Sequence, residues 1–348
     1  MSGIADVARL AGVSKATASR ALTGRGYVSA ETRDRVIQAA QTLSYVASSN
    51  AASLVTGRTQ NVGVIMPYVN RWFFAEVLEG IQDTLLEHGL DLTLYDARPG
   101  TAGRTLIFGD FLARKRFDGL IAVGLEAEDR ELERLLAIGR PIVSVVGAAT
   151  GTSVVSIDDE NAVERATGHL LALGHRRIAF LGGDPQGYWA DVDRRRLSGY
   201  TAAMTAAGLS DAVQHVPSEV TLQGGYAAAV DLLSDHHLRP TAIAAVCDEV
   251  AIGAIIAARR LGIQVPTDLS VIGVDDHEYA DMFALTTMQQ SPRQQGSAAV
   301  DLLMTSMAAP ETPPVEMRLE ARLIVRSSTS PPVGAESVIA SDTPLQRR

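Results

Sequence analysis

Residues 6–22 of the chain read DVARLAGVSKATASRAL, and this stretch decides the fold of the N-terminal segment. Small apolar residues recur at helical spacing and predict a first helix: Ile4, Val7, Ala8 and Ala11. Gly12 suits the left-handed end of that helix, and Ser14 can cap a second helix that runs to about Leu22. Two helices joined by so tight a turn predict a helix-turn-helix.

A third helix is expected after a glycine-rich loop. Ser29 can cap this helix, and its predicted buried stripe consists of Val36, Ile37, Ala40 and Leu43. Residues 46–60 are mostly small and polar and hold too little apolar surface to fold alone. We therefore expect an all-α head over residues 1–45 and a linker over residues 46–60.

The second helix carries the side chains that can read DNA. A helix-turn-helix inserts the N-terminal end of this helix into the major groove. Lys15, Ala16 and Arg20 fall on the side that packing does not need. Arg20 can make a bidentate contact to guanine, and Lys15 can reach the same base edge. The hydroxyl side chains that we expect to contact phosphates are Ser14, Thr17, Ser19 and Thr32.

Charge is divided unevenly along the chain, whose net charge is −9. Residues 1–60 hold seven Lys and Arg against three Asp and Glu, a balance of +4, so the remainder carries −13. A small basic head on a large acidic body is typical of a protein that touches phosphates at one end only.

The overall composition, 46% hydrophobic and 20% charged, is that of a globular protein. A length of 348 residues favours two or three domains. No apolar run is long enough to span a membrane, and the N-terminus lacks the pattern of a secretory signal. Cys247 is the single cysteine, which excludes an intramolecular disulfide and a cysteine-built metal site. We expect a cytoplasmic protein without metal or cofactor.

From residue 61 onward, short β-branched or apolar runs alternate with helical patterns. The expected strands are 61–67, 90–95, 118–123, 141–145, 177–181, 242–246 and 270–274. Such alternation predicts an α/β fold of parallel sheets with helices on both faces, and the number of strands favours two similar lobes. Residues 329–348 are poor in apolar residues and predict a disordered tail.

The stretch quoted first continues as YVSAETR at 27–33, and together they strongly resemble the DNA-binding head of the LacI (lactose repressor) family. Four later strings resemble the family's effector domain: VGVI at 62–65, FDGLI at 117–121, HLLALGHRRIA at 169–179 and PTDLSVIGVDD at 266–276. The resemblance implies a two-lobed body at 61–328, like that of periplasmic sugar-binding proteins. It implies three crossovers, with lobe 1 at about 61–158 and 290–320 and lobe 2 at about 159–289 and 321–328.

The resemblance also assigns roles in DNA binding. It places Lys15, Ala16 and Arg20 where the family reads bases, although Ala16 offers only a methyl group. The family's linker forms a hinge helix that wedges a leucine into the minor groove, and Leu54 stands at that position. The chain departs from the pattern at Ala47 and Ala52, so an ordinary linker leucine stays open as the alternative for Leu54.

The family binds its ligand between the lobes, where strands end. The residues that the resemblance and the chemistry of the side chains imply as ligand contacts are Arg71, Trp72, Phe73, Arg196, Asp248 and Asp275. Structural alternatives stay open: a salt bridge for Arg196, a helix cap for Asp248 and a turn cap for Asp275. Aromatic, arginine and aspartate side chains around a cleft fit a sugar or sugar derivative, and a nucleoside or purine also fits. Arg71 beside Trp72 leaves a negatively charged or phosphorylated sugar open as well.

The resulting hypothesis is a transcription regulator, a repressor rather than an activator, controlled by a small ligand. We expect it to bind a near-palindromic operator as a homodimer. One alternative is a solute-binding protein without a regulatory DNA function, and another is a regulator that senses a nucleoside or purine as co-repressor. The sequence contains no phosphate loop, nucleophile elbow or cluster at metal spacing, so no catalysis is expected.

Overall fold

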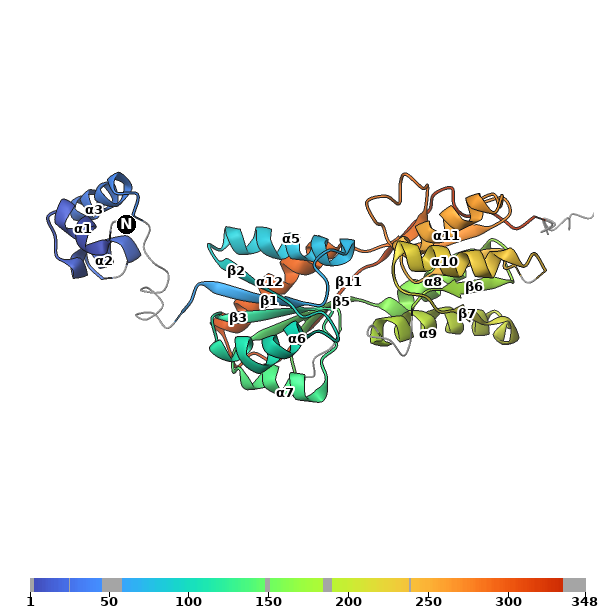
Figure 1. Ribbon diagram of the computed structural model, residues 1–348, viewed down its shortest axis with the longest axis horizontal. Helices are drawn as coiled ribbons and strands as arrows, with labels where there is room; N and C mark the ends of the chain where they lie inside the picture. Colours follow the sequence, from blue (N-terminus) through green and yellow to red (C-terminus); the bar gives the residue numbers. More distant parts are fainter. Residues whose placement is uncertain are drawn as a thin grey trace, which may run out of the picture.

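The computed structural model describes residues 3–24, 26–45, 58–147, 151–183, 190–237 and 239–333. An N-terminal head of three helices precedes a body of two α/β lobes (Figure 1). The predicted hinge positions Ala47, Ala52 and Leu54 lie outside the described residues, as do residues 334–348. Within the described ranges, no helix combines the length and apolarity that a membrane span requires.

The helices of the head are α1 (Ile4–Leu10), α2 (Lys15–Thr23) and α3 (Ala30–Thr42). Ser14 caps α2, since its hydroxyl accepts a hydrogen bond from the backbone N of Thr17 at 3.1 Å. The buried core consists of Val7, Ala8, Ala11, Ala18, Ala21, Val36, Ala39 and Ala40. Ile37, predicted to be buried, is instead 38% exposed, because the buried face of α3 follows positions 36, 39 and 40 and Ile37 lies beside it.

Lobe 1 is built on a six-stranded parallel sheet with the order β11-β5-β4-β3-β1-β2. Its strands are β1 (Asn61–Met66), β2 (Asp91–Asp96), β3 (Gly119–Val123), β4 (Ile142–Val145), β5 (Ser153–Ile157) and β11 (Glu316–Leu319). Helices α5 (Trp72–Glu87) and α12 (Pro292–Ala308) pack on one face. The other face is covered by α6 (Ala102–Leu106), a π-helical turn (Ile107–Phe111), a 3-10 turn (Leu112–Arg114) and α7 (Asp129–Ala137).

Lobe 2 is built on a second six-stranded sheet with the order β12-β10-β9-β8-β6-β7, in which only β12 runs antiparallel to its neighbour. Its strands are β6 (Ile178–Leu181), β7 (Gln214–Val216), β8 (Ala242–Ala245), β9 (Ser270–Asp275), β10 (Thr286–Gln289) and β12 (Arg322–Ile324). Its helices are α8 (Asp159–Ala172), α9 (Ala190–Ala206), a 3-10 turn (Ser210–Ala212), α10 (Leu222–Ser234) and α11 (Asp248–Arg260). In Figure 1, α10 and α11 lie on one side of the sheet and α9 on the other.

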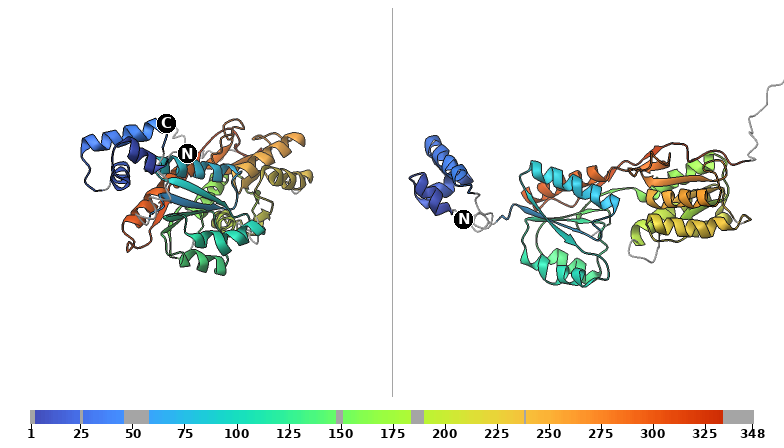
Figure 2. Two further views of the ribbon diagram at one scale, coloured as in Figure 1. Left: turned by 60° about the vertical axis from the view of Figure 1, so that its left-hand side comes forward. Right: turned by 45° about the horizontal axis from the view of Figure 1, so that its top comes forward.

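Three connections join the lobes: β5 to α8, β10 to α12 and β11 to β12. The lobes lie end to end, as the right-hand view of Figure 2 shows. Residues 329–330, which were expected to begin a disordered tail, are instead bonded to lobe 2. The backbone N of Ser330 donates to Oγ of Ser270 at 3.0 Å, and the Thr329 hydroxyl lies 3.0 Å from Nε2 of His169. Polar side chains of lobe 2 thus hold a segment that has little apolar surface of its own.

Candidate nucleic-acid interface and ligand cavity

The second helix of the head presents an exposed face at its N-terminal end. Lys15, Ala16 and Arg20 are all exposed on α2, whereas Ala18 is buried in the core of the head. The side chain of Arg20 passes the loop after α2, where a Cβ on Gly26 would lie 3.3 Å from Cδ of Arg20. The three predicted base-reading residues are therefore all accessible from solvent.

Three of the four predicted phosphate contacts lie at helix N-termini, where backbone N–H groups favour anions. The hydroxyls of Ser14 and Thr17 lie 2.9 Å apart at the start of α2. At the start of α3, the Ser29 hydroxyl donates to the hydroxyl oxygen of Thr32 at 2.9 Å. Ser19 lies further along α2 and is half-buried.

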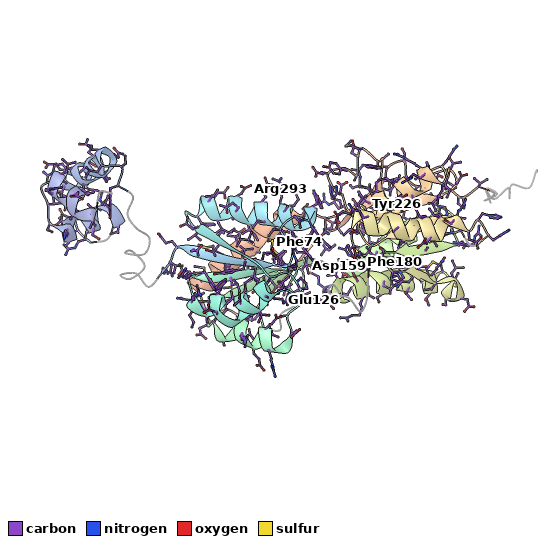
Figure 3. The ribbon with its side chains drawn as sticks, in the orientation of Figure 1. Phe74, Glu126, Asp159, Phe180, Tyr226 and Arg293 are labelled. Atoms are coloured by element: carbon purple, nitrogen blue, oxygen red, sulfur yellow. The ribbon has the colours of Figure 1, made fainter. Side chains whose placement is uncertain are left out.

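A cavity lies between the lobes, at the ends of strands of both sheets. Lobe 1 contributes Arg71, Phe73, Phe74 and Val146 to its wall. The other wall residues are Val192, Asp193, Arg196, Val220, Val246, Cys247, Glu249 and Asp275 of lobe 2 and Gln290 of the connection to α12. Figure 3 shows Phe74 and Glu126 at the end of lobe 1 that faces lobe 2, with Asp159 at the junction. Open α/β sheets bind ligands at the carboxyl ends of their strands, which is where this cavity lies.

Arg196 is a buried cation in the cavity wall, with 8% of its surface exposed. Its Nε donates to Oδ1 of Asp159 at 2.8 Å, and its Nη1 donates to the carbonyl oxygen of Val246 at 2.6 Å. Burial alone lowers the pKa of Arg196, but the carboxylates of Asp159 and Asp275 raise it above its ordinary value. Arg196 thus forms the salt bridge that was the structural alternative and also faces the cavity.

Asp275 ends β9 with a strained backbone. Its φ is 131° and that of Asp276 is 60°, in the region that L-residues avoid. The carboxylate is 6% exposed, and its Oδ1 accepts a hydrogen bond from Nε2 of Gln290 at 2.6 Å. Burial raises the pKa of Asp275 to about 6, although the charge of Arg196 opposes this effect. Strain of this kind clusters at ligand sites, and here it accompanies a carboxylate in the cavity wall.

Asp248 lies outside the cavity lining and is held by protein groups, so its contact with a ligand stays a prediction. Its Oδ1 accepts from the hydroxyl of Thr287 at 2.7 Å, and its Oδ2 accepts from the backbone N of His277 at 2.9 Å. A Cβ on Gly273 would lie 2.0 Å from Oδ1, so glycine is required beneath this carboxylate. Burial raises the pKa of Asp248 to about 8, and the nearby charge of Asp275 adds to the rise. The side chain ties α11 to β10 and to the loop after β9.

The residues at the start of α5 contact both the cavity and the opposite lobe. Phe73 lines the cavity and Trp72 does not, and contact of either with a ligand stays a prediction. The Trp72 ring packs against His277 of lobe 2, with 4.7 Å between ring centroids. Arg71 lines the cavity and also spans the lobes, since its Nη1 donates to the carbonyl oxygen of Val220 at 3.1 Å.

Sequence reasoning missed several residues of the cavity wall, among them Asp193, Glu249 and Gln290. Burial raises the pKa of Glu249, and the charge of Arg71 opposes the rise. The position of Glu249, just after strand β8, was a signal that could have found it. Gln290 likewise follows strand β10, but this strand was not among those predicted from the sequence, so the same signal could not be used.

Comparisons with known proteins identify the family. Residues 3–48 match the model of bacterial regulatory proteins of the lacI family, and residues 167–329 match a periplasmic binding protein-like domain. The HTH-type transcriptional regulator DegA of Bacillus subtilis is 33% identical over 94% of this chain and 98% of its own. The HTH-type transcriptional regulator CelR of Thermobifida fusca is 34% identical over 92% of this chain and 96% of its own. The chain belongs to the lacI family.

Solved structures of lacI-family proteins agree with this fold. The lac repressor dimer bound to operator and an anti-inducer superposes with a TM-score of 0.84 at 26% identity, covering 94% of this chain and 99% of that one. A complex of the regulator CelR with cellobiose superposes with a TM-score of 0.69 at 29% identity, covering 94% and 100%. The chain is thus a lacI-family transcription regulator with a helix-turn-helix head. The predicted family and fold class are confirmed.

Proposed function

We propose that this lacI-family regulator is a repressor whose affinity for a near-palindromic operator is set by a neutral sugar in the interlobe cavity. The observation that carries the ligand class is the cavity wall, where carboxylates and guanidinium groups stand beside the rings of Phe73 and Phe74. Such polar groups bind hydroxyls and fix orientation, and the aromatic surfaces contact the apolar parts of a ligand. The solved CelR structure contains cellobiose, which supports a sugar.

The charges of the wall favour a neutral ligand over a phosphorylated one. Three carboxylates, those of Asp193, Glu249 and Asp275, face two guanidinium groups. Both arginines already bind protein groups, Arg196 to Asp159 and Arg71 to a backbone carbonyl. A phosphate would therefore meet an excess of negative charge, whereas sugar hydroxyls can donate to the carboxylates.

The lac repressor structure, a dimer on its operator, supports the same assembly for this chain. Two heads of a homodimer reach half-sites about one helical turn apart. A ligand that favours one angle between the lobes changes the spacing of the heads, and ligand and DNA then alter each other's affinity by the same free energy, about 1–3 kcal/mol. This role requires no catalysis and places the protein with the DNA in the cytoplasm.

Thermal unfolding of the full chain with a panel of neutral sugars, sugar phosphates, nucleosides and purines tests the ligand class. A neutral sugar should raise the Tm and change operator affinity, and Asp275→Asn should abolish both responses. Asp276→Asn is the matched control, because Asp276 pairs with Arg326 at 2.8 Å and does not line the cavity. A response to purines or nucleosides alone, or to sugar phosphates alone, would contradict the proposal.

A further inference from the structure

Three buried side chains form a hydrogen-bonded chain that starts in the cavity wall. Nε2 of Gln295 donates to Oε1 of Gln290 at 2.8 Å, and Nε2 of Gln290 donates to Oδ1 of Asp275 at 2.6 Å. The exposed fractions of Gln295, Gln290 and Asp275 are 0%, 5% and 6%. Gln290 and Asp275 line the cavity, and Gln295 lies behind them on α12.

The charge at one end fixes the direction of every hydrogen bond in this chain. An ionised carboxylate can only accept, so Gln290 turns its NH₂ group toward Asp275 and its oxygen toward Gln295. Gln295 must then present its own NH₂ group to Gln290. As a result, Oε1 of Gln295 is buried without a hydrogen-bond partner among the described residues. Leaving a buried acceptor unpaired has a free-energy cost, and the bond from Gln295 to Gln290 is kept despite this cost.

The same chain crosses from one lobe to the other. Asp275 ends β9 in the sheet of lobe 2, and Gln290 follows β10 at the connection. Gln295 belongs to α12, which packs on lobe 1. The helix is held closely there, since a Cβ on Gly296 would lie 2.3 Å from the carbonyl oxygen of Val77 on α5. Gln295 is therefore a fixed point of lobe 1 from which Gln290 is oriented.

We propose that Gln295 is a positioning residue that holds the amide of Gln290 in the orientation that the carboxylate of Asp275 requires, and thereby ties this carboxylate to lobe 1. This inference deepens the proposed function, and it rests on that function only where a ligand is assigned to Asp275. Protonation of Asp275 removes the charge that requires Gln290 to donate, and so releases the constraint on the two amides. Movement at the carboxylate then reaches α12 through two hydrogen bonds.

The titration of Asp275 reports on this arrangement. Burial raises its pKa, and the hydrogen bond from Gln290 lowers it. The charged groups that act on Asp275 include Arg196, Asp159 and Glu249, and Asp248 lies close by with Asp276 next to it. None of these groups changes when Gln295 is replaced, so a shifted titration isolates the contribution of the amide chain.

The experiment is a pH titration of the full chain, labelled with ¹³C at aspartate carboxyl groups and followed by NMR. Asp275→Asn identifies the signal. Gln295→Met removes the amide at nearly constant length and should raise the pKa of Asp275 by about one pH unit, because Gln290 no longer holds its donor in place. Gln294→Met, at the exposed neighbouring position, should leave the titration unchanged.

Gln290→Met is a second variant, which keeps the test decisive if Gln295→Met fails to fold. It should raise the pKa of Asp275 at least as much, and adding Gln295→Met to it should cause no further shift. A lower Tm with an unchanged Asp275 titration would assign Gln295 to packing alone and overturn the proposal. Additive shifts in the double variant would also overturn it. No ligand is needed, so failure of the sugar proposal leaves this test standing.

Discussion

The DNA-binding head and the interlobe cavity use charge in opposite ways. Lys15 and Arg20 of the head are exposed to solvent, whereas Arg196 and Asp275 in the cavity wall are 8% and 6% exposed and bonded to neighbours. Exposed cations are hydrated and act on phosphates through a field that salt screens. Buried charges depend on their partners, so removing one partner is costly. Substitutions in the head should therefore change DNA binding, and those in the cavity should change stability and pH dependence as well.

The largest effect is expected at Asp159, the buried partner of Arg196. Asp159→Ala leaves the guanidinium group buried without its carboxylate, which should lower the free energy of unfolding of the body by about 3–5 kcal/mol. Urea denaturation measures this loss. Glu160→Ala removes the adjacent exposed carboxylate and should cost less than about 0.5 kcal/mol. Similar losses in the two variants would contradict the distinction between buried and exposed charge.

A second effect concerns pH, because burial raises the pKa of Asp275 from 3.8 to about 6. The folded state binds this proton more tightly than the unfolded state. The stabilisation that this proton gives the folded state is thus complete below about pH 4. It is lost as the pH rises through the pKa of Asp275 in the folded state. The free energy of unfolding should fall by about 2–3 kcal/mol over this window.

Comparison with Asp275→Asn isolates this contribution from those of other carboxylates. Urea denaturation at several pH values should give a difference between wild type and variant that changes with pH in the stated direction. A constant difference across the window would show that Asp275 titrates normally.

The third effect concerns DNA binding by the head. Arg20→Ala should reduce specific operator binding by about 1–3 kcal/mol and relax the preference at one base pair, without changing the Tm. Fluorescence anisotropy measures both, with an operator obtained by selection from random DNA and with its single-base variants. Arg35→Ala on α3, where Arg35 is exposed near Glu31, provides the control. Uniform weakening on all DNA would assign Arg20 to a phosphate instead.

The smallest effect is expected at the cap of α2. Ser14→Ala removes the acceptor for the backbone N of Thr17 and should cost the head about 1 kcal/mol in stability. Ser14→Asn retains a capping acceptor and should restore most of this loss in thermal unfolding. If the asparagine variant were as unstable as the alanine variant, the cap would not be the source of the effect.

The head could be predicted closely because its determinants are local. Apolar spacing of three and four residues and one capping serine place α2, and the face left free of packing then carries Lys15 and Arg20. Ile37 is an exception within the head. Its position beside the buried stripe of the third helix predicted burial, but its side chain is exposed.

The cavity could be predicted only in part because its wall is assembled from distant segments. Asp248 and Glu249 are adjacent at the start of α11. The Asp248 carboxylate binds the Thr287 hydroxyl of β10, whereas Glu249 lines the cavity. Composition cannot say which of two neighbouring acids turns which way, since packing against Gly273 and Thr287 decides it. The chemistry of Trp72 suits a ligand contact, but its ring packs against His277 of the opposite lobe.

The most direct test of the central claim, a sequence-specific regulator under ligand control, is selection of bound fragments from random double-stranded DNA at near-physiological salt. The account predicts recovery of a near-palindromic motif with half-sites about one helical turn apart. Repeating the selection with pooled sugars should change the yield of that motif. Weak, salt-sensitive binding with no motif, both without ligand and with pooled sugars and nucleosides, would contradict the account.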